Sequence, residues 1–163
     1  MNKISILILF ISLSGCFGKD PQKTGLEGKP LPTFNLFLAD SMTYLNTSTI
    51  PSGKPIALLY FGPNCPYSRA QIEEIINHNQ SLQDIQFYVF TISSFQEMKQ
   101  FYHHYQLNKY PNIKVGVDYK TFFSSYFEIP GVPFMAIYGK DRRLNKAFIG
   151  QVSSKQIKSI ANE

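Results

Sequence analysis

Residues 56–72, IALLYFGPNCPYSRAQI, place a cysteine between a strongly apolar run and a helical pattern. The continuous apolar run 56–61 is typical of a strand that is buried on both faces of a sheet. A Gly-Pro-Asn tripeptide ends that strand, and Pro66 suits the first turn of a helix. Cys65 is therefore predicted at a helix N-terminus, where free backbone N–H groups stabilise a thiolate. The alternative is a buried cysteine that acts as a small apolar residue.

Strand and helix patterns alternate on both sides of this stretch. A hairpin is predicted first, because two short strand-like pieces flank Asp40 and Ser41. The further predicted strands are residues 85–92, 112–117, 134–138 and 146–149. Helices are predicted from Pro66, around 98–105, over 119–127 and after Ser153. This order predicts an α/β fold with a mixed central sheet, flanking helices and an N-terminal β-hairpin.

The first sixteen residues, MNKISILILFISLSGC, have the pattern of a secretion signal. Leu13-Ser14-Gly15-Cys16 resembles a bacterial lipobox, which implies cleavage before Cys16 and acyl chains on that residue. Several acyl chains hold a protein stably on a membrane. We therefore expect a lipoprotein signal peptide over 1–15, a lipidated, Gly- and Pro-rich tether over 16–27 and one domain over 28–163. An ordinary signal peptide with an incidental cysteine, or an uncleaved anchor, remains the alternative.

Charge and cysteine content narrow the function classes. The net charge is +5, but the basic residues are scattered and do not form the dense stripe of a nucleic-acid-binding protein. The chain has two cysteines. If Cys16 carries lipid, Cys65 has no partner for an intrachain disulfide.

Two motifs resemble the thioredoxin superfamily. The stretch from Phe61 to Ser68 is similar to its strand–loop–helix with a Cys-x-x-Cys site, and Gly-Val-Pro-Phe at 131–134 is similar to its cis-proline segment. The resemblance covers residues 28–161 and extends to the membrane-anchored TlpA/ResA-like redoxins. It implies a thioredoxin-like fold in which Cys65 is the nucleophile. Val132, cis-Pro133 and Tyr67 are then the expected substrate-binding residues.

The sequence departs from this family at three positions of the site. Asn64 stands where a Trp is usual, Ser68 replaces the second cysteine, and Gln71 stands where some members carry a proton-transferring Glu. A second thiol normally resolves the mixed disulfide formed by the first. Ser68 cannot do so, although its hydroxyl can donate a hydrogen bond to the Cys65 thiolate. This departure from the resembled family therefore predicts a monothiol site.

Two functions remain open from the sequence. The first is a membrane-tethered, monothiol thiol–disulfide oxidoreductase outside the cytoplasm, with Cys65 and Ser68 as its catalytic residues. The second is a binding module that kept the fold and lost redox turnover, so enzymatic activity is left undecided. We expect cell-envelope protein thiols or disulfides as partners, and a lipid anchor on the periplasmic side or in the outer membrane. No cofactor, metal or nucleic acid is expected, and Gly62 excludes a peroxiredoxin-type site.

Overall fold

The computed structural model describes residues 18–163. The predicted signal peptide and Cys16 lie outside these residues, so the lipid anchor and the proposed domain boundaries stay predictions. Within residues 18–163, no helix is long and apolar enough to cross a bilayer.

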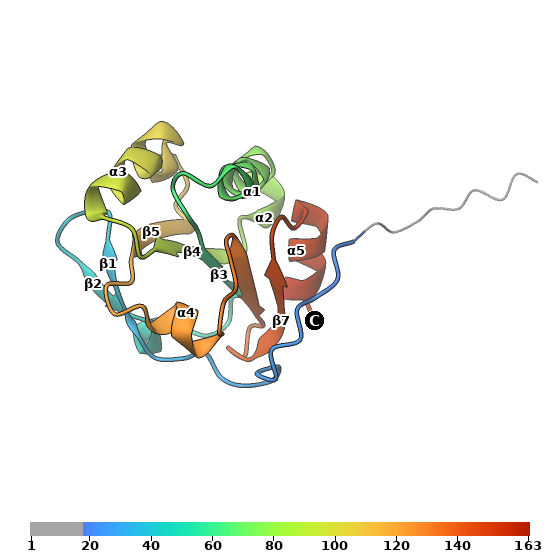
Figure 1. The fold of residues 1–163 in the computed structure, drawn as a ribbon. Coiled ribbons are helices and arrows are strands. Elements are labelled where there is room, and N and C mark those ends of the chain that lie inside the picture. The colour runs from blue at the N-terminus through green and yellow to red at the C-terminus, as the bar shows by residue number, and fades with distance from the viewer. Residues whose placement is uncertain (1–17) are drawn as a thin grey trace, which may run out of the picture.

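A seven-stranded mixed sheet forms the centre of the molecule (Figure 1). Its strand order is β2-β1-β5-β4-β3-β6-β7. The three central strands β5, β4 and β3 are parallel, and every other pairing is antiparallel. The strands are β1 Asn35–Leu38, β2 Tyr44–Asn46, β3 Ile56–Tyr60, β4 Gln86–Thr91, β5 Ile113–Val117, β6 Phe134–Tyr138 and β7 Leu144–Ile149. The predicted hairpin and mixed sheet are confirmed.

Helices cover both faces of the sheet. Helices α1, α2, α3 and α5 pack on one face, and the short α4 packs on the other (Figure 1). The helices are α1 Pro66–Asn77, α2 Asn79–Leu82, α3 Phe95–His104, α4 Phe122–Tyr126 and α5 Ser154–Ala161, with short 3₁₀ turns at Thr47–Thr49 and Leu107–Lys109. Ser153 caps α5 as predicted, because its side chain accepts the backbone N–H of Gln156 at 3.3 Å.

The strand that precedes Cys65 is buried on both faces. Alternate residues of β3 point to opposite sides, so Ala57 and Leu59 join the core under α1, whereas Leu58 and Tyr60 join the core under α4. All five residues of β3 are buried. Because β3 lies between β4 and β6, its C-terminal end is fixed from both sides, and this end leads directly into the Cys65 loop.

Residues 18–31, which we call the N-terminal strap, lie along β7. They include most of the predicted tether. Gln22 and Pro30 form antiparallel bridges with Ala147 and Arg143, so the strap runs opposite to β7. Figure 1 shows it as the blue segment beside β7 and α5. Composition indicated a tether because glycine and proline favour irregular chain, but the strap uses its backbone groups to pair with the edge strand.

Candidate functional site

Cys65 occupies the N-cap position of α1. Its backbone is extended, with φ −80° and ψ 121°, and Pro66 follows as the first helical residue. A tight turn precedes it, because the Cys65 N–H donates to the Gly62 carbonyl at 3.0 Å. The thiol is half-buried. The predicted placement at a strand–loop–helix junction is confirmed, and the alternative of a fully buried, inert cysteine does not describe this residue.

The surroundings of Cys65 favour its thiolate. Partial burial raises the pKa of the Cys65 thiol, but the backbone N–H and hydroxyl of Ser68 and the backbone N–H of Tyr67 outweigh this effect, so the pKa is lowered. Ser68 is fully buried, and its hydroxyl oxygen accepts the Gly62 N–H at 3.2 Å. That bond leaves the hydroxyl proton of Ser68 free to face the sulfur.

The segment before β6 forms the other wall of the site. The Cys65 Sγ–H donates to the Val132 carbonyl oxygen at 3.6 Å, and the peptide bond between Val132 and Pro133 is cis. Gly62 allows this approach, because a Cβ there would lie 3.2 Å from Val132 Cγ2. The fold thus brings Cys65, Ser68 and Val132 together, although 67 residues separate the cysteine from the valine.

Tyr67 lies apart from these contacts. Its side chain is 64% exposed, and it reaches the site only through its backbone N–H. Substrate binding by the Tyr67 ring and by the Val132 backbone therefore stays a prediction. In the sequence, Gly62 was interpreted as a loop residue and as evidence against a peroxiredoxin-type site, and nothing in the local pattern indicated its contact with Val132.

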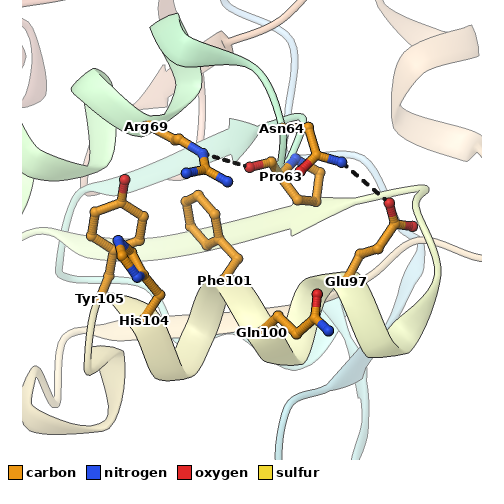
Figure 2. Close-up of a pocket in the computed structure, with 8 residues that line it drawn as sticks. All are labelled: Pro63, Asn64, Arg69, Glu97, Gln100, Phe101, His104 and Tyr105. Carbon is orange, nitrogen blue, oxygen red and sulfur yellow. Dashed lines mark hydrogen bonds between the residues drawn. The ribbon is translucent and has the colours of Figure 1, made fainter.

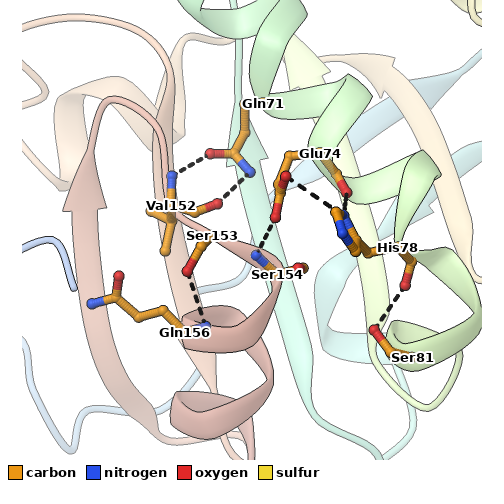
Figure 3. A network of polar contacts seen from close by, with 8 residues as sticks. All are labelled: Gln71, Glu74, His78, Ser81, Val152, Ser153, Ser154 and Gln156. Atoms are coloured by element: carbon orange, nitrogen blue, oxygen red, sulfur yellow. Dashed lines mark hydrogen bonds and ion pairs between the residues drawn. The ribbon is translucent and has the colours of Figure 1, made fainter. Parts of the chain in front are cut away.

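Gln71 and Glu74 of α1 hold the loop before α5 (Figure 3). Gln71 is buried, and its amide bonds the Val152 backbone twice: Nε2 donates to the carbonyl at 3.1 Å, and Oε1 accepts the N–H at 2.6 Å. Glu74 Oε1 accepts the Ser154 N–H at 2.6 Å. Burial raises the pKa of Glu74, but hydrogen bonds from Ser154 and electrostatic attraction to the nearby His78 outweigh this effect, so the pKa is lowered. Gln71 therefore joins two elements instead of moving protons.

A polar pocket of about 190 Å³ lies on the α3 side of the Cys65 loop (Figure 2). Arg69 Nε donates to the Pro63 carbonyl at 3.0 Å, and Asn64 Nδ2 donates to Glu97 Oε1 at 3.4 Å. The lining residues are Pro63, Asn64, Arg69, Glu97, Gln100, Phe101, His104 and Tyr105. Cys65 does not line it, because its thiol faces Val132 on the other side of the loop.

Across residues 18–163, no three His, Cys, Asp or Glu side chains come close enough to hold a metal ion. Asp118 is buried at the end of β5, where its carboxylate accepts the backbone N–H groups of Lys120 and Phe123. It therefore fixes the start of α4. Chemically, the site offers one polarised thiol beside the carbonyl of the half-buried Val132.

Comparison with known proteins supports the fold at low sequence identity. No protein-family model matches the sequence, and no curated protein sequence matches it. A secreted Mycobacterium tuberculosis disulfide oxidoreductase, described as homologous to E. coli DsbE, superposes with a TM-score of 0.64 at 16% identity; the match covers 78% of this chain and 93% of that one.

Two further solved structures agree. StoA from Bacillus subtilis matches with a TM-score of 0.61 at 13% identity, covering 79% of this chain and 96% of its own. The thioredoxin domain of a Bacteroides vulgatus thiol-disulfide oxidoreductase matches with a TM-score of 0.64 at 9% identity, covering 82% and 93%. Together with the strand order and the Cys65 loop, these likenesses show that the chain has the thioredoxin-like fold.

Proposed function

We propose that this protein is a lipid-anchored, extracytoplasmic thiol–disulfide exchange protein that works through one cysteine. The observation that carries the proposal is the position of Cys65, which sits half-buried at the N-cap of α1 with the buried Ser68 beside it. These surroundings lower the pKa of the Cys65 thiol. Structures with the same fold include disulfide oxidoreductases. The signal pattern and Cys16 support the proposed anchor and the proposed location in the cell envelope.

The proposed reaction is an exchange without net oxidation. The Cys65 thiolate attacks one sulfur of a substrate disulfide, a new bond forms between Cys65 Sγ and that sulfur, and the old sulfur–sulfur bond breaks. The second substrate sulfur leaves as a thiolate and takes a proton from solvent. Because Ser68 has no thiol, an external thiolate must attack the mixed disulfide and release Cys65. Substrate backbone is proposed to pair with Val132.

One observation favours the second function, a binding module without turnover. Gln71, which replaces a residue that moves protons in some members of the resembled family, is fully occupied by the Val152 backbone. Ser68 likewise accepts the Gly62 N–H and supports the loop. A site whose polar side chains support the structure in this way can keep a binding groove after the loss of chemistry.

Titration of Cys65 by pH-dependent alkylation separates the two functions. We expect a midpoint below the value of about 8.5 of a free thiol, and a higher midpoint in Ser68→Ala, because one stabilising hydroxyl is lost. Cys65→Ala is the blank, since it leaves no thiol in the mature domain. A wild-type midpoint at or above that of a free thiol would remove the basis for exchange chemistry.

The anchor is tested separately through Cys16. The Cys16→Ser chain should lose acyl labelling and should either stay uncleaved or leave the membrane fraction. Its Cys65 titration should equal that of the lipidated protein, because the site lies in the folded domain. Unchanged processing and acyl labelling of Cys16→Ser would contradict the lipid anchor and leave the exchange chemistry standing.

A further inference from the structure

The N-terminal strap is bound to the domain along its length. Backbone hydrogen bonds join Gln22 N–H to the Ala147 carbonyl at 2.7 Å and Gly28 N–H to the Leu144 carbonyl at 2.8 Å. The Leu144 N–H donates in turn to the Lys29 carbonyl at 2.9 Å. These bonds extend the sheet beyond β7, so the strap is held at a fixed position on the domain.

The upstream end of the strap is fixed to α5. The Lys19 N–H donates to Gln156 Oε1 at 3.0 Å, and Gln156 Nε2 donates back to the Lys19 carbonyl at 2.6 Å. The Lys19 ammonium lies over Gly150, where a Cβ would come within 2.5 Å of it. Gly150 has a φ of +79°, which glycine adopts without strain. The chain therefore enters the domain between β7 and α5.

This entry point lies at the same end of the molecule as Cys65. The Gly150 N–H donates to the Pro133 carbonyl at 2.7 Å, and the adjacent Val132 carbonyl accepts the Cys65 thiol. Three contacts thus lead from Lys19 to the thiol. The antiparallel course of the strap explains this. Its first residues meet the end of β7, and that end pairs with the start of β6, the strand that directly follows Val132 and Pro133.

Chain length limits how far the anchor lies from this end. Cys16 and Lys19 are three residues apart, which span at most about 11 Å even when fully extended. A domain of this size has a radius of gyration of roughly 15 Å. A lipid on Cys16 therefore holds the end that carries Cys65 close to the membrane surface, while the opposite end faces away from it.

We propose that the strap orients the domain with Cys65 toward the membrane, so that its substrates are disulfides and thiols of proteins held at the membrane surface. This inference rests on the proposed lipid anchor and deepens the proposed function by naming its substrate class. Disulfides of soluble envelope proteins can undergo the same exchange with Cys65, but these proteins reach the thiol only by entering the space between the domain and the bilayer.

Orientation is measured by energy transfer to labelled lipid headgroups, using the lipidated protein in phosphatidylethanolamine–phosphatidylglycerol vesicles. One donor is placed on Cys65. The matched donor is placed at the exposed position 140, through Lys140→Cys in a Cys65→Ser background. Position 140 follows β6, whose five residues span about 17 Å from the Cys65 end. Stronger transfer from position 65 is expected; equal or weaker transfer would overturn the orientation.

A strap variant tests the cause of the orientation. Gln156→Ala removes both side-chain bonds to Lys19 but leaves the Cys65 loop untouched. The difference in transfer between positions 65 and 140 should shrink in this variant. An undiminished difference would show that the bonds between Gln156 and Lys19 do not set the orientation and would overturn that part of the proposal.

A pair of disulfide reagents tests the substrate class. The protein is mixed with a pyridyl disulfide carried on a phosphatidylethanolamine headgroup or with the same disulfide in water. Attack by the Cys65 thiolate on either reagent forms a mixed disulfide and releases a chromophoric thione. The rate on the lipid-linked reagent, relative to the soluble one, should fall in Gln156→Ala. Reaction with the soluble reagent alone would refute the membrane-facing site and support the exchange chemistry. If Cys65 reacts with neither reagent, the proposed exchange chemistry is refuted. The energy-transfer measurement still decides the orientation in that case.

Discussion

Replacement of Gln71 by alanine removes the polar bridge between α1 and the loop before α5. The Gln71 amide is buried and makes two hydrogen bonds, at 3.1 and 2.6 Å, to the backbone of Val152, a residue 81 positions away. Because Val152 is itself buried, its backbone N–H and carbonyl lose their partners in Gln71→Ala. The free energy of unfolding therefore falls because two buried backbone groups are left without hydrogen-bond partners and because a small cavity forms.

The cost of Gln71→Ala is bounded by two limits. Two ordinary hydrogen bonds are worth about 1–3 kcal/mol net, and two unsatisfied buried groups cost about 2–6 kcal/mol. We expect a loss of about 3 kcal/mol in the free energy of unfolding. For a domain of this size, that loss lowers the melting temperature by about 6–12 °C.

Urea denaturation followed by circular dichroism measures the loss, with Gln151→Ala as the matched control. Gln151 is exposed, so the same truncation there should change stability by less than about 0.5 kcal/mol. The alkylation midpoint of Cys65 should not change in Gln71→Ala, because Gln71 is not among the groups that shift the Cys65 pKa. A loss below about 1 kcal/mol, or one equal to that of Gln151→Ala, would refute the bridge.

Three further predictions concern the site and its support. Gly62→Ala places a Cβ at 3.4 Å from the Cys65 Cβ, so alkylation of Cys65, measured above the pKa of its thiol, should slow. An unchanged rate would show that the loop relaxes freely. Ser68→Cys should convert a protein with almost no insulin-reducing activity into an active one, because it supplies the resolving thiol; rapid turnover by wild type would contradict the monothiol site. Hydrogen bonds from Ser154 outweigh burial and lower the pKa of Glu74 in the folded state. The ionised Glu74 therefore stabilises the fold at pH values above its pKa in the unfolded chain, and this stabilisation is lost as the pH falls through its pKa in the folded state. Denaturation midpoints across pH should show this loss in wild type and not in Glu74→Gln, and identical profiles would refute it.

Local sequence determined most of the elements and the position of the reactive group. The apolar run 56–61 favoured a strand buried on both faces, and the proline at position 66 favoured a helix that begins directly after Cys65; both predictions are confirmed. Both follow from properties of neighbouring residues, namely hydrophobic periodicity and the fixed backbone of proline. The order of these elements, with the resemblance of two motifs, was sufficient to predict the fold.

The contacts that tune the site were decided by the tertiary structure. Val132 meets Cys65 across 67 residues, and Gln71 meets Val152 across 81 residues. The strap shows the same limit: its glycines and prolines indicated a tether, yet its backbone pairs with β7. Backbone hydrogen bonding depends on which edge lies nearby and not on side-chain pattern, so no local signal reveals it. The sequence by itself located the thiol, and only the fold decided what surrounds it and which way it faces.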